Sequence, residues 1–214
     1  GPADVAGAMN RSLIMRSCRE DGVLLRADKP ATAIDASFGA SFDTLKPIHA
    51  WGTFSQVGAA RWSYLLGLNL AQPLHITPST LDPAAAIAGD SSYSWVAYEG
   101  WHGIAASAAT GSACHTHNNC FQLLSGSDAA STQELVLPSC PQVSDMTLGH
   151  TLWNVAPVLP GGWVYLGEKD KIVAVSSRRL RSWNSTTPML TLSLLAAVSR
   201  LFASLIYRSY SADD

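Results

Sequence analysis

The sequence has little charge, few cysteines and no long uninterrupted apolar run. Only 14% of its 214 residues are Asp, Glu, Lys or Arg, whereas an average soluble chain carries about 25%. The net charge of −2 comes without a basic stripe, which argues against a nucleic-acid-binding protein. The one basic cluster, Arg178, Arg179 and Arg181, is interpreted as a solvated turn. We therefore expect a partner, another domain or a membrane to cover part of this thinly charged surface.

The longest apolar stretch, residues 190–207, argues against a membrane-spanning segment. Arg200 interrupts it, and it falls short of the about 20 residues that a spanning helix needs. Two patterns compete over residues 188–208. A helical stripe, which the pattern alone favours, consists of Leu194, Leu195, Val198, Leu201, Phe202 and Leu205. Two strands joined by a loose turn are the alternative, with Leu190, Leu192, Leu194, then Phe202, Ser204 and Ile206 alternating.

Elsewhere, short apolar runs alternate with turn residues, which predicts strands. Hairpins are predicted for residues 12–27 around Asp21-Gly22, for 49–70 around Gly58, and for 161–180 with a turn at 168–171. Further strands are predicted over residues 75–81, 92–100, 120–126 and 133–140. Strands at this spacing are typical of an all-β, antiparallel β-sandwich. We expect a single domain, with a lead-in segment over 1–48 that contains a β-hairpin, and an antiparallel β-domain over 49–214.

Motifs for catalysis and cofactor binding are missing. The sequence has no G-x-S-x-G elbow, no P-loop and no G-x-G-x-x-G, so we predict no cofactor. Cys18 or Cys140 could pair with one of several histidines, namely His49, His75, His102 and His150. A buried structural cysteine is the more common outcome for such residues.

Residues 113–120, ACHTHNNC, offer two thiols and two imidazoles. Cys114, His115, His117 and Cys120 are the ligand types of tetrahedral zinc, but four ligands within seven residues is poor spacing for a structural site. A Cys114–Cys120 disulfide in an oxidising compartment is a second interpretation, and free thiols with loop histidines are a third. Sequons at Asn10 and Asn184 are compatible with a secreted or lumenal protein.

Aromatic side chains surround Glu99 in the sequence. The candidate carbohydrate-binding residues are Trp95, Tyr98, Glu99, Trp101 and His102. Aromatic faces can stack on a sugar ring while a carboxylate accepts hydrogen bonds from its hydroxyl groups. The alternative is that the alternation of Tyr93, Trp95 and Ala97 simply faces a core.

Three stretches together resemble the α-galactosidase-like glycoside hydrolases, including the raffinose synthase and seed-imbibition group. The segment that leaves the catalytic barrel in that family is matched by Gly1-Pro2, Asp21-Gly22, Leu25-Arg26, Pro30, Asp35 and Phe38. Residues 49–81 are similar to the first strands of the family's C-terminal antiparallel β-domain, and residues 162–180 to its closing strands. Two departures are that one glycine precedes Pro2 and that residues 105–160 have no counterpart.

The resemblance implies that this chain begins where a catalytic barrel would end. The family's two catalytic carboxylates lie on barrel strands that precede this segment, so no catalytic residue is carried over. The expected function is a non-catalytic accessory β-domain that packs against a barrel domain or another protein subunit and contacts glycan through surface tryptophans. The alternatives are a structural or interaction subunit with no carbohydrate role, and an independent hydrolase using Glu99 or a Cys–His pair. For residues 188–208 the resemblance favours the hairpin.

Overall fold

The computed structural model describes residues 11–34, 50–70, 72–77, 94–102, 121–125, 134–139, 149–168, 171–186, 189–195 and 204–208. These residues form one short helix and twelve strands, and every strand pair is antiparallel. The elements are α1 (Arg11–Ser17), β1 (Thr32–Ala33), β2 (Ala50–Val57), β3 (Ala60–Leu68), β4 (Leu74–Ile76), β5 (Ser94–His102), β6 (Phe121–Ser125), β7 (Leu135–Leu137), β8 (His150–Leu159), β9 (Trp163–Glu168), β10 (Leu180–Thr186), β11 (Met189–Leu194) and β12 (Ser204–Arg208). The predicted all-β, antiparallel fold is confirmed.

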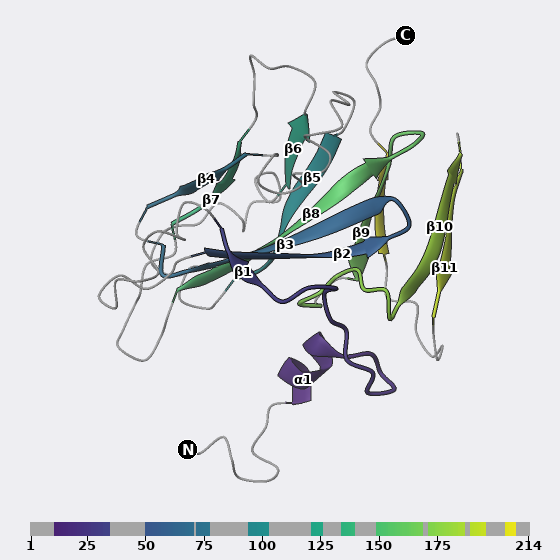
Figure 1. Ribbon diagram of the computed structural model, residues 1–214, viewed down its shortest axis with the longest axis horizontal. Helices are drawn as coiled ribbons and strands as arrows, with labels where there is room; N and C mark the ends of the chain where they lie inside the picture. Colours follow the sequence, from purple (N-terminus) through teal and green to yellow (C-terminus); the bar gives the residue numbers. More distant parts are fainter. Residues whose placement is uncertain are drawn as a thin grey trace.

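The main sheet runs in the order β1-β2-β3-β8-β5-β6, and Figure 1 shows β3 and β8 side by side across its middle. At its end, β8 turns into β9, which pairs with β12. Two small sheets, β10-β11 and β4-β7, complete the set. In Figure 1, β4 and β7 lie toward one side of the molecule and β9 to β11 toward the other.

The main sheet has a hydrophobic core on each face. Along β3, Trp62 and Tyr64 point into one core while Leu65 points into the other, as strand geometry requires. The first core also takes side chains from β9 to β11 and the second from β4 and β7. The alternation of Trp62 and Tyr64 with Ser63 predicts a half-buried strand, but Ser63 and Leu65 are buried as well. That prediction was wrong because the sheet is covered on both sides.

The β2–β3 hairpin is confirmed. Val57 pairs with Ala60 across a two-residue turn, in which Gly58 has a φ of 62°. The third predicted hairpin is only half right. β9 forms as predicted, but the described residues between β9 and β10 form an irregular segment instead of the second strand of a hairpin. Gly167, with a φ of 88°, redirects the chain, and the Glu168 N–H donates to the Ala174 carbonyl at 2.8 Å.

The first predicted hairpin has a helix in place of its first strand. Residues 11–17 form α1, and only the Cys18–Leu24 bridge, around Gly22, retains hairpin pairing. The helix is stabilised by a distant residue, because the Lys171 ammonium donates to the Met15 and Cys18 carbonyls at 2.5 and 2.7 Å. This contact satisfies carbonyls that the end of a helix leaves unpaired.

The C-terminal helix is also a wrong prediction where the structure describes the chain. Residues 189–194 form β11 and pair with β10, while residues 204–208 form β12 and pair with β9. Along β11, Leu190, Leu192 and Leu194 pack against the first core and the residues between them are exposed. The two segments are strands, as the alternative predicted, but they pair with other strands and not with each other. In the part of the chain that is described, no helix has the length and apolar character to span a membrane.

Candidate functional site

The aromatic residues predicted around Glu99 are divided between the two faces of β5. Trp95, 8% exposed, lies in the second core with Ala97, while Tyr98 packs against the first. The Tyr98 hydroxyl donates to the Leu166 carbonyl, and burial raises the pKa of this phenol above its ordinary value. Core packing, the alternative interpretation, is therefore what the structure shows for Trp95 and Ala97. Trp95 and Tyr98 do not form one surface on which a sugar could stack.

Glu99 is held by a polar side chain on the neighbouring strand. Thr151 Oγ1 on β8 donates to the Glu99 carboxylate at 2.8 Å and accepts a hydrogen bond from Trp153 Nε1 at 3.0 Å. Beyond Glu99 the ladder shifts register at Gly100, where an added Cβ would lie 2.1 Å from Asn154 Nδ2. Any larger residue at this bulge would require the buried Asn154 side chain to shift. After it, Trp101 and His102 continue β5 opposite β8.

The predicted zinc or disulfide segment, with Cys114, His115, His117 and Cys120, lies outside the described residues. Within the described ranges, no three His, Cys, Asp or Glu side chains gather as a metal site would need.

The described residues do not support the hypothesis that a cysteine pairs with a histidine. Cys18 is a buried free thiol, and its Sγ donates to the Ile14 carbonyl at 3.2 Å. His75 lies instead 2.8 Å from Glu134, across the β4–β7 pair. Both residues have structural contacts in separate places.

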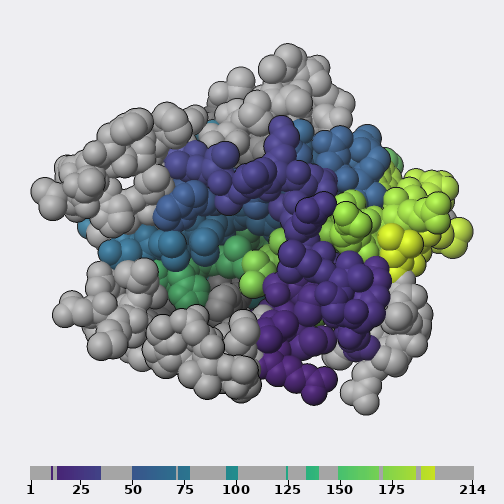
Figure 2. All heavy atoms as spheres, turned by 60° about the horizontal axis from the view of Figure 1, so that its bottom comes forward, coloured from purple at the N-terminus to yellow at the C-terminus, as the bar shows by residue number. Residues whose placement is uncertain are grey.

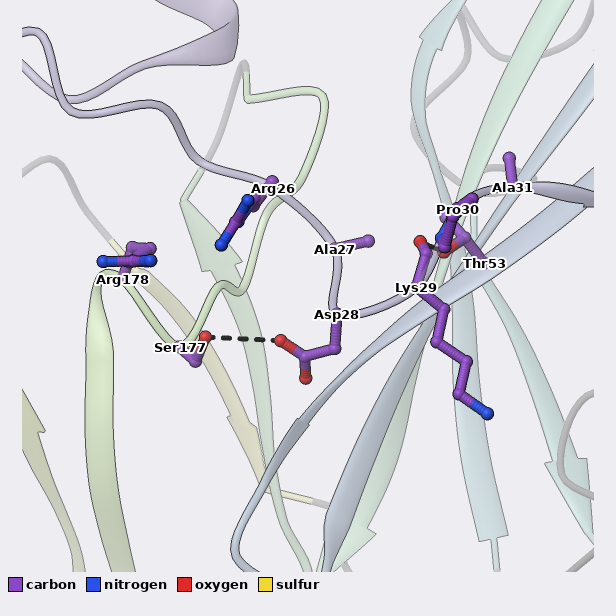
Figure 3. Close-up of a pocket in the computed structure, with 9 residues that line it drawn as sticks. All are labelled: Arg26, Ala27, Asp28, Lys29, Pro30, Ala31, Thr53, Ser177 and Arg178. Atoms are coloured by element: carbon purple, nitrogen blue, oxygen red, sulfur yellow. Dashed lines mark hydrogen bonds between the residues drawn. The ribbon is translucent and has the colours of Figure 1, made fainter.

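A polar hollow of about 580 Å³ lies between the lead-in segment and the residues before β10 (Figure 3). We call it the lead-in hollow; it is lined by Arg26, Ala27, Asp28, Lys29, Pro30, Ala31, Thr53, Ser177 and Arg178. The Asp28 N–H donates to the Phe54 carbonyl at 2.9 Å, and Thr53 Oγ1 donates to the Lys29 carbonyl at 2.6 Å. These bonds fix the lead-in segment along β2.

The sequence interpretation missed this hollow, although it noted the Arg178–Arg181 cluster. The structure divides that cluster. Arg178 and Arg181 are exposed, as predicted, but Arg179 is largely buried, with Nε 2.9 Å from Oε1 of buried Glu168. Only the fold brings Arg26 to Arg178, 152 positions later, so no local pattern could have shown their proximity.

A second, smaller hollow of about 160 Å³ lies at the end of the main sheet. Trp95, Trp183, Pro157, Pro160 and Arg61 contribute to this sheet-end hollow. Trp183 is half-buried, and its Nε1 donates to the Val57 carbonyl at 2.8 Å. The little of Trp95 that water reaches is therefore next to a second tryptophan.

No protein-family model, curated protein or solved structure matches this chain. The resemblance to α-galactosidase-like enzymes therefore stays a hypothesis that depends on the quoted motifs.

Proposed function

We propose that this chain is a non-catalytic β-domain that packs against a partner domain through the surface around its lead-in segment. The resemblance suggests that the partner is a glycoside hydrolase barrel. One observation carries the proposal: exposed large apolar side chains occur in the lead-in segment and in two later segments that hydrogen-bond to it. Four of the five in the described residues, Ile14, Leu24, Ile172 and Leu195, form what we call the lead-in face.

Hydrogen bonds connect the parts of the lead-in face. The Ile172 N–H donates to the Arg16 carbonyl of α1 at 3.0 Å, and the Arg19 guanidinium contacts the Leu195 carbonyl at 3.5 Å. Figure 2 shows the purple lead-in residues on the surface beside the green-to-yellow residues of the later chain. Apolar side chains concentrated in one region of a surface are typical of an interaction site.

The described carboxylates support the non-catalytic part of the proposal. Five of them already bind groups of this chain, in the pairs Asp21–Arg19, Asp28–Ser177, Glu99–Thr151, Glu134–His75 and Glu168–Arg179. A retaining glycosidase instead directs two carboxyl groups at one substrate from about 5 Å apart. Turnover of an aryl α-galactoside by the purified chain would contradict this part.

Leu24 and Leu25 offer a matched test of the lead-in face, because they are neighbours with 57% and 4% exposure. A photo-crosslinking residue at position 24 should capture one discrete partner in the native cells, whereas the same residue at exposed Gln56 should not. We expect Leu24→Ser to abolish complex formation with that partner and to change stability by less than about 0.5 kcal/mol. Leu25→Ser should cost about 2–4 kcal/mol. Equal capture from positions 24 and 56 would contradict the assignment of this face.

Only aromatic rings that are accessible to solvent could contact a glycan. Trp183, which is half-buried in the sheet-end hollow, is such a ring, and Trp95 is almost covered. Retention on a glycan-affinity gel that is lost in Trp183→Leu, with thermal unfolding still cooperative, would support a glycan role. Equal retention of both proteins would remove this ring from the proposal.

A further inference from the structure

The lead-in hollow is more positive than the chain as a whole. Arg26, Lys29 and Arg178 line it with a single acid, Asp28, giving a formal charge of +2 (three cations minus one anion) in a chain with net charge −2. All four of these residues are exposed. A concentration of one sign of charge in a concave surface attracts ligands of the opposite sign.

The Asp28 carboxylate is hydrogen-bonded to Gln56 and Ser177 rather than to either arginine. Its Oδ2 accepts a hydrogen bond from the Gln56 N–H at 2.7 Å, and its Oδ1 accepts one from Ser177 Oγ at 3.3 Å. Within the part of the chain that the structure describes, the guanidinium groups of Arg26 and Arg178 make no ion pair. Both arginines line the same hollow, and no carboxylate of the described residues pairs with either of them.

One buried hydroxyl fixes the backbone of both arginines. Ser176, 1% exposed, donates from Oγ to the Arg26 carbonyl at 2.9 Å and accepts from the Arg178 N–H at 3.3 Å. Arg19 adds a bond to the Arg178 carbonyl at 2.8 Å. Figure 3 shows Arg26 and Arg178 projecting on one side of the Asp28–Ser177 hydrogen bond, while Lys29 extends on the other. Holding the backbones in place reduces the entropy that a bound ligand must remove.

We propose that the lead-in hollow binds a phosphate group carried on a small molecule, between Arg26 and Arg178. Guanidinium groups present paired N–H donors that match the oxygens of phosphate, and such charge-assisted bonds are stronger than neutral ones. The hollow's volume of about 580 Å³ falls within the range of small-molecule sites and exceeds what an inorganic ion fills. The remaining space is available to the group that carries the phosphate.

Calorimetric titration of the whole chain at low ionic strength tests the proposal, because salt screens exposed charges. The probes are inorganic phosphate, glucose 6-phosphate and glucose. We expect both phosphate compounds to bind at one site and glucose not to bind. Absence of saturable binding by glucose 6-phosphate would overturn the proposal, as would binding of glucose with equal affinity.

Matched variants locate the site. Arg26→Gln and Arg178→Gln should each weaken glucose 6-phosphate binding by about tenfold or more, since each removes charge-assisted hydrogen bonds. Arg181→Gln removes the same charge from an exposed position outside the hollow, and we expect less than about a twofold effect from its distant field. Thermal unfolding verifies that all three variants fold. If Arg181→Gln weakens binding as much as Arg178→Gln, the attraction is diffuse and the proposed site is wrong.

Discussion

Hydrogen bonds from side chains to backbone carbonyls hold residues 163–180, where the structure describes them, from two sides. The bonds on one side are largely buried, and those on the other side are exposed or partly exposed to water. On the sheet side, buried or partly buried aromatic side chains donate to its backbone: Trp62 to the Tyr165 carbonyl, Tyr64 to that of Val175 and Tyr98 to that of Leu166. On the lead-in side, exposed or half-buried polar groups make the bonds, with Lys171 contacting α1 and Arg19 contacting the Arg178 carbonyl.

The two sides differ in the free energy that is lost when one of these hydrogen bonds is removed. On the lead-in side, water and salt can take the place of the missing partner, so each contact contributes little. On the sheet side, the partner left behind is buried and stays unsatisfied, which costs about 1–3 kcal/mol. We therefore expect the sheet side to determine stability and the lead-in side to determine local order.

The largest effect is expected at the Glu168–Arg179 pair, which lies between the two sides. Arg179→Met leaves the Glu168 carboxylate, 7% exposed at its side chain, without its ion partner. Breaking a buried pair in this way costs about 3–5 kcal/mol, measurable by urea unfolding. Arg178→Met is the control, because this neighbouring exposed residue should change stability by less than about 0.5 kcal/mol. If both variants lost the same stability, the burial of Arg179 would not be the reason for its larger contribution.

Next comes Tyr64→Phe, which tests the sheet side. Its hydroxyl donates to the Val175 carbonyl and accepts from the Val175 N–H, so the variant should lose about 2 kcal/mol. Tyr98→Phe, which removes a donor to one carbonyl, should lose about 1 kcal/mol.

The pH dependence of the Tyr64 effect has a definite sign. Burial raises the pKa of the Tyr64 phenol, so its contribution is complete below the unfolded-state pKa of about 10 and is lost as pH rises above it. Urea unfolding across this pH range should show a smaller loss of stability in Tyr64→Phe than in the parent chain. An identical pH slope in the two proteins would contradict this assignment.

A smaller effect is expected from Lys171→Met on the lead-in side. The ammonium bonds two carbonyls at the end of α1, which also favours a positive charge, and its loss should cost about 0.5 kcal/mol. Hydrogen exchange should accelerate in residues 11–18 and remain slow in β8. Lys29→Met, which removes an exposed ammonium over the Phe54 ring, is the control. Acceleration of β8 to the same extent would show that the two sides are not independent.

The smallest effect is expected from Asp21→Asn. The Arg19 guanidinium lowers the pKa of Asp21 to about 2, so the stabilising charge is present above the unfolded-state value and is lost as pH falls toward 2. The difference in thermal midpoint between Asp21→Asn and the parent chain should shrink between pH 5 and pH 2. It should also shrink in 1 M salt, where the Debye length is about 3 Å. A difference that is constant with pH would contradict the role of this ion pair.

Local patterns predicted the hairpin between neighbouring strands and several single strands. The β2–β3 hairpin follows from two apolar runs around Gly58, β6 and β7 fall inside predicted strands, and β5 overlaps the strand predicted at 92–100. By contrast, β8 was not predicted, although it is the strand that joins β3 to β5. Its residues HTLWNVAPVL are buried on both faces and show no alternation, so period-two reasoning does not detect them.

The candidate site was predictable only in part, because it depends on contacts between residues that are distant in the sequence. The alternation along β5 was compatible with a core position for Trp95. It could not show which of the two cores Tyr98 would join. The lead-in hollow depends on Arg26 and Arg178 meeting across the fold, and the Ser176 bonds that place them are tertiary contacts.

By itself, the sequence determined an all-β antiparallel chain, because alternation and turn chemistry act over a few residues. Only the tertiary structure decided that residues 11–17 are helical, that 189–194 and 204–208 join different sheets, and that the arginines share a hollow. The physical reason is that a short apolar segment gains most of its stability from the surface it packs against. That surface is built from residues far away in the chain.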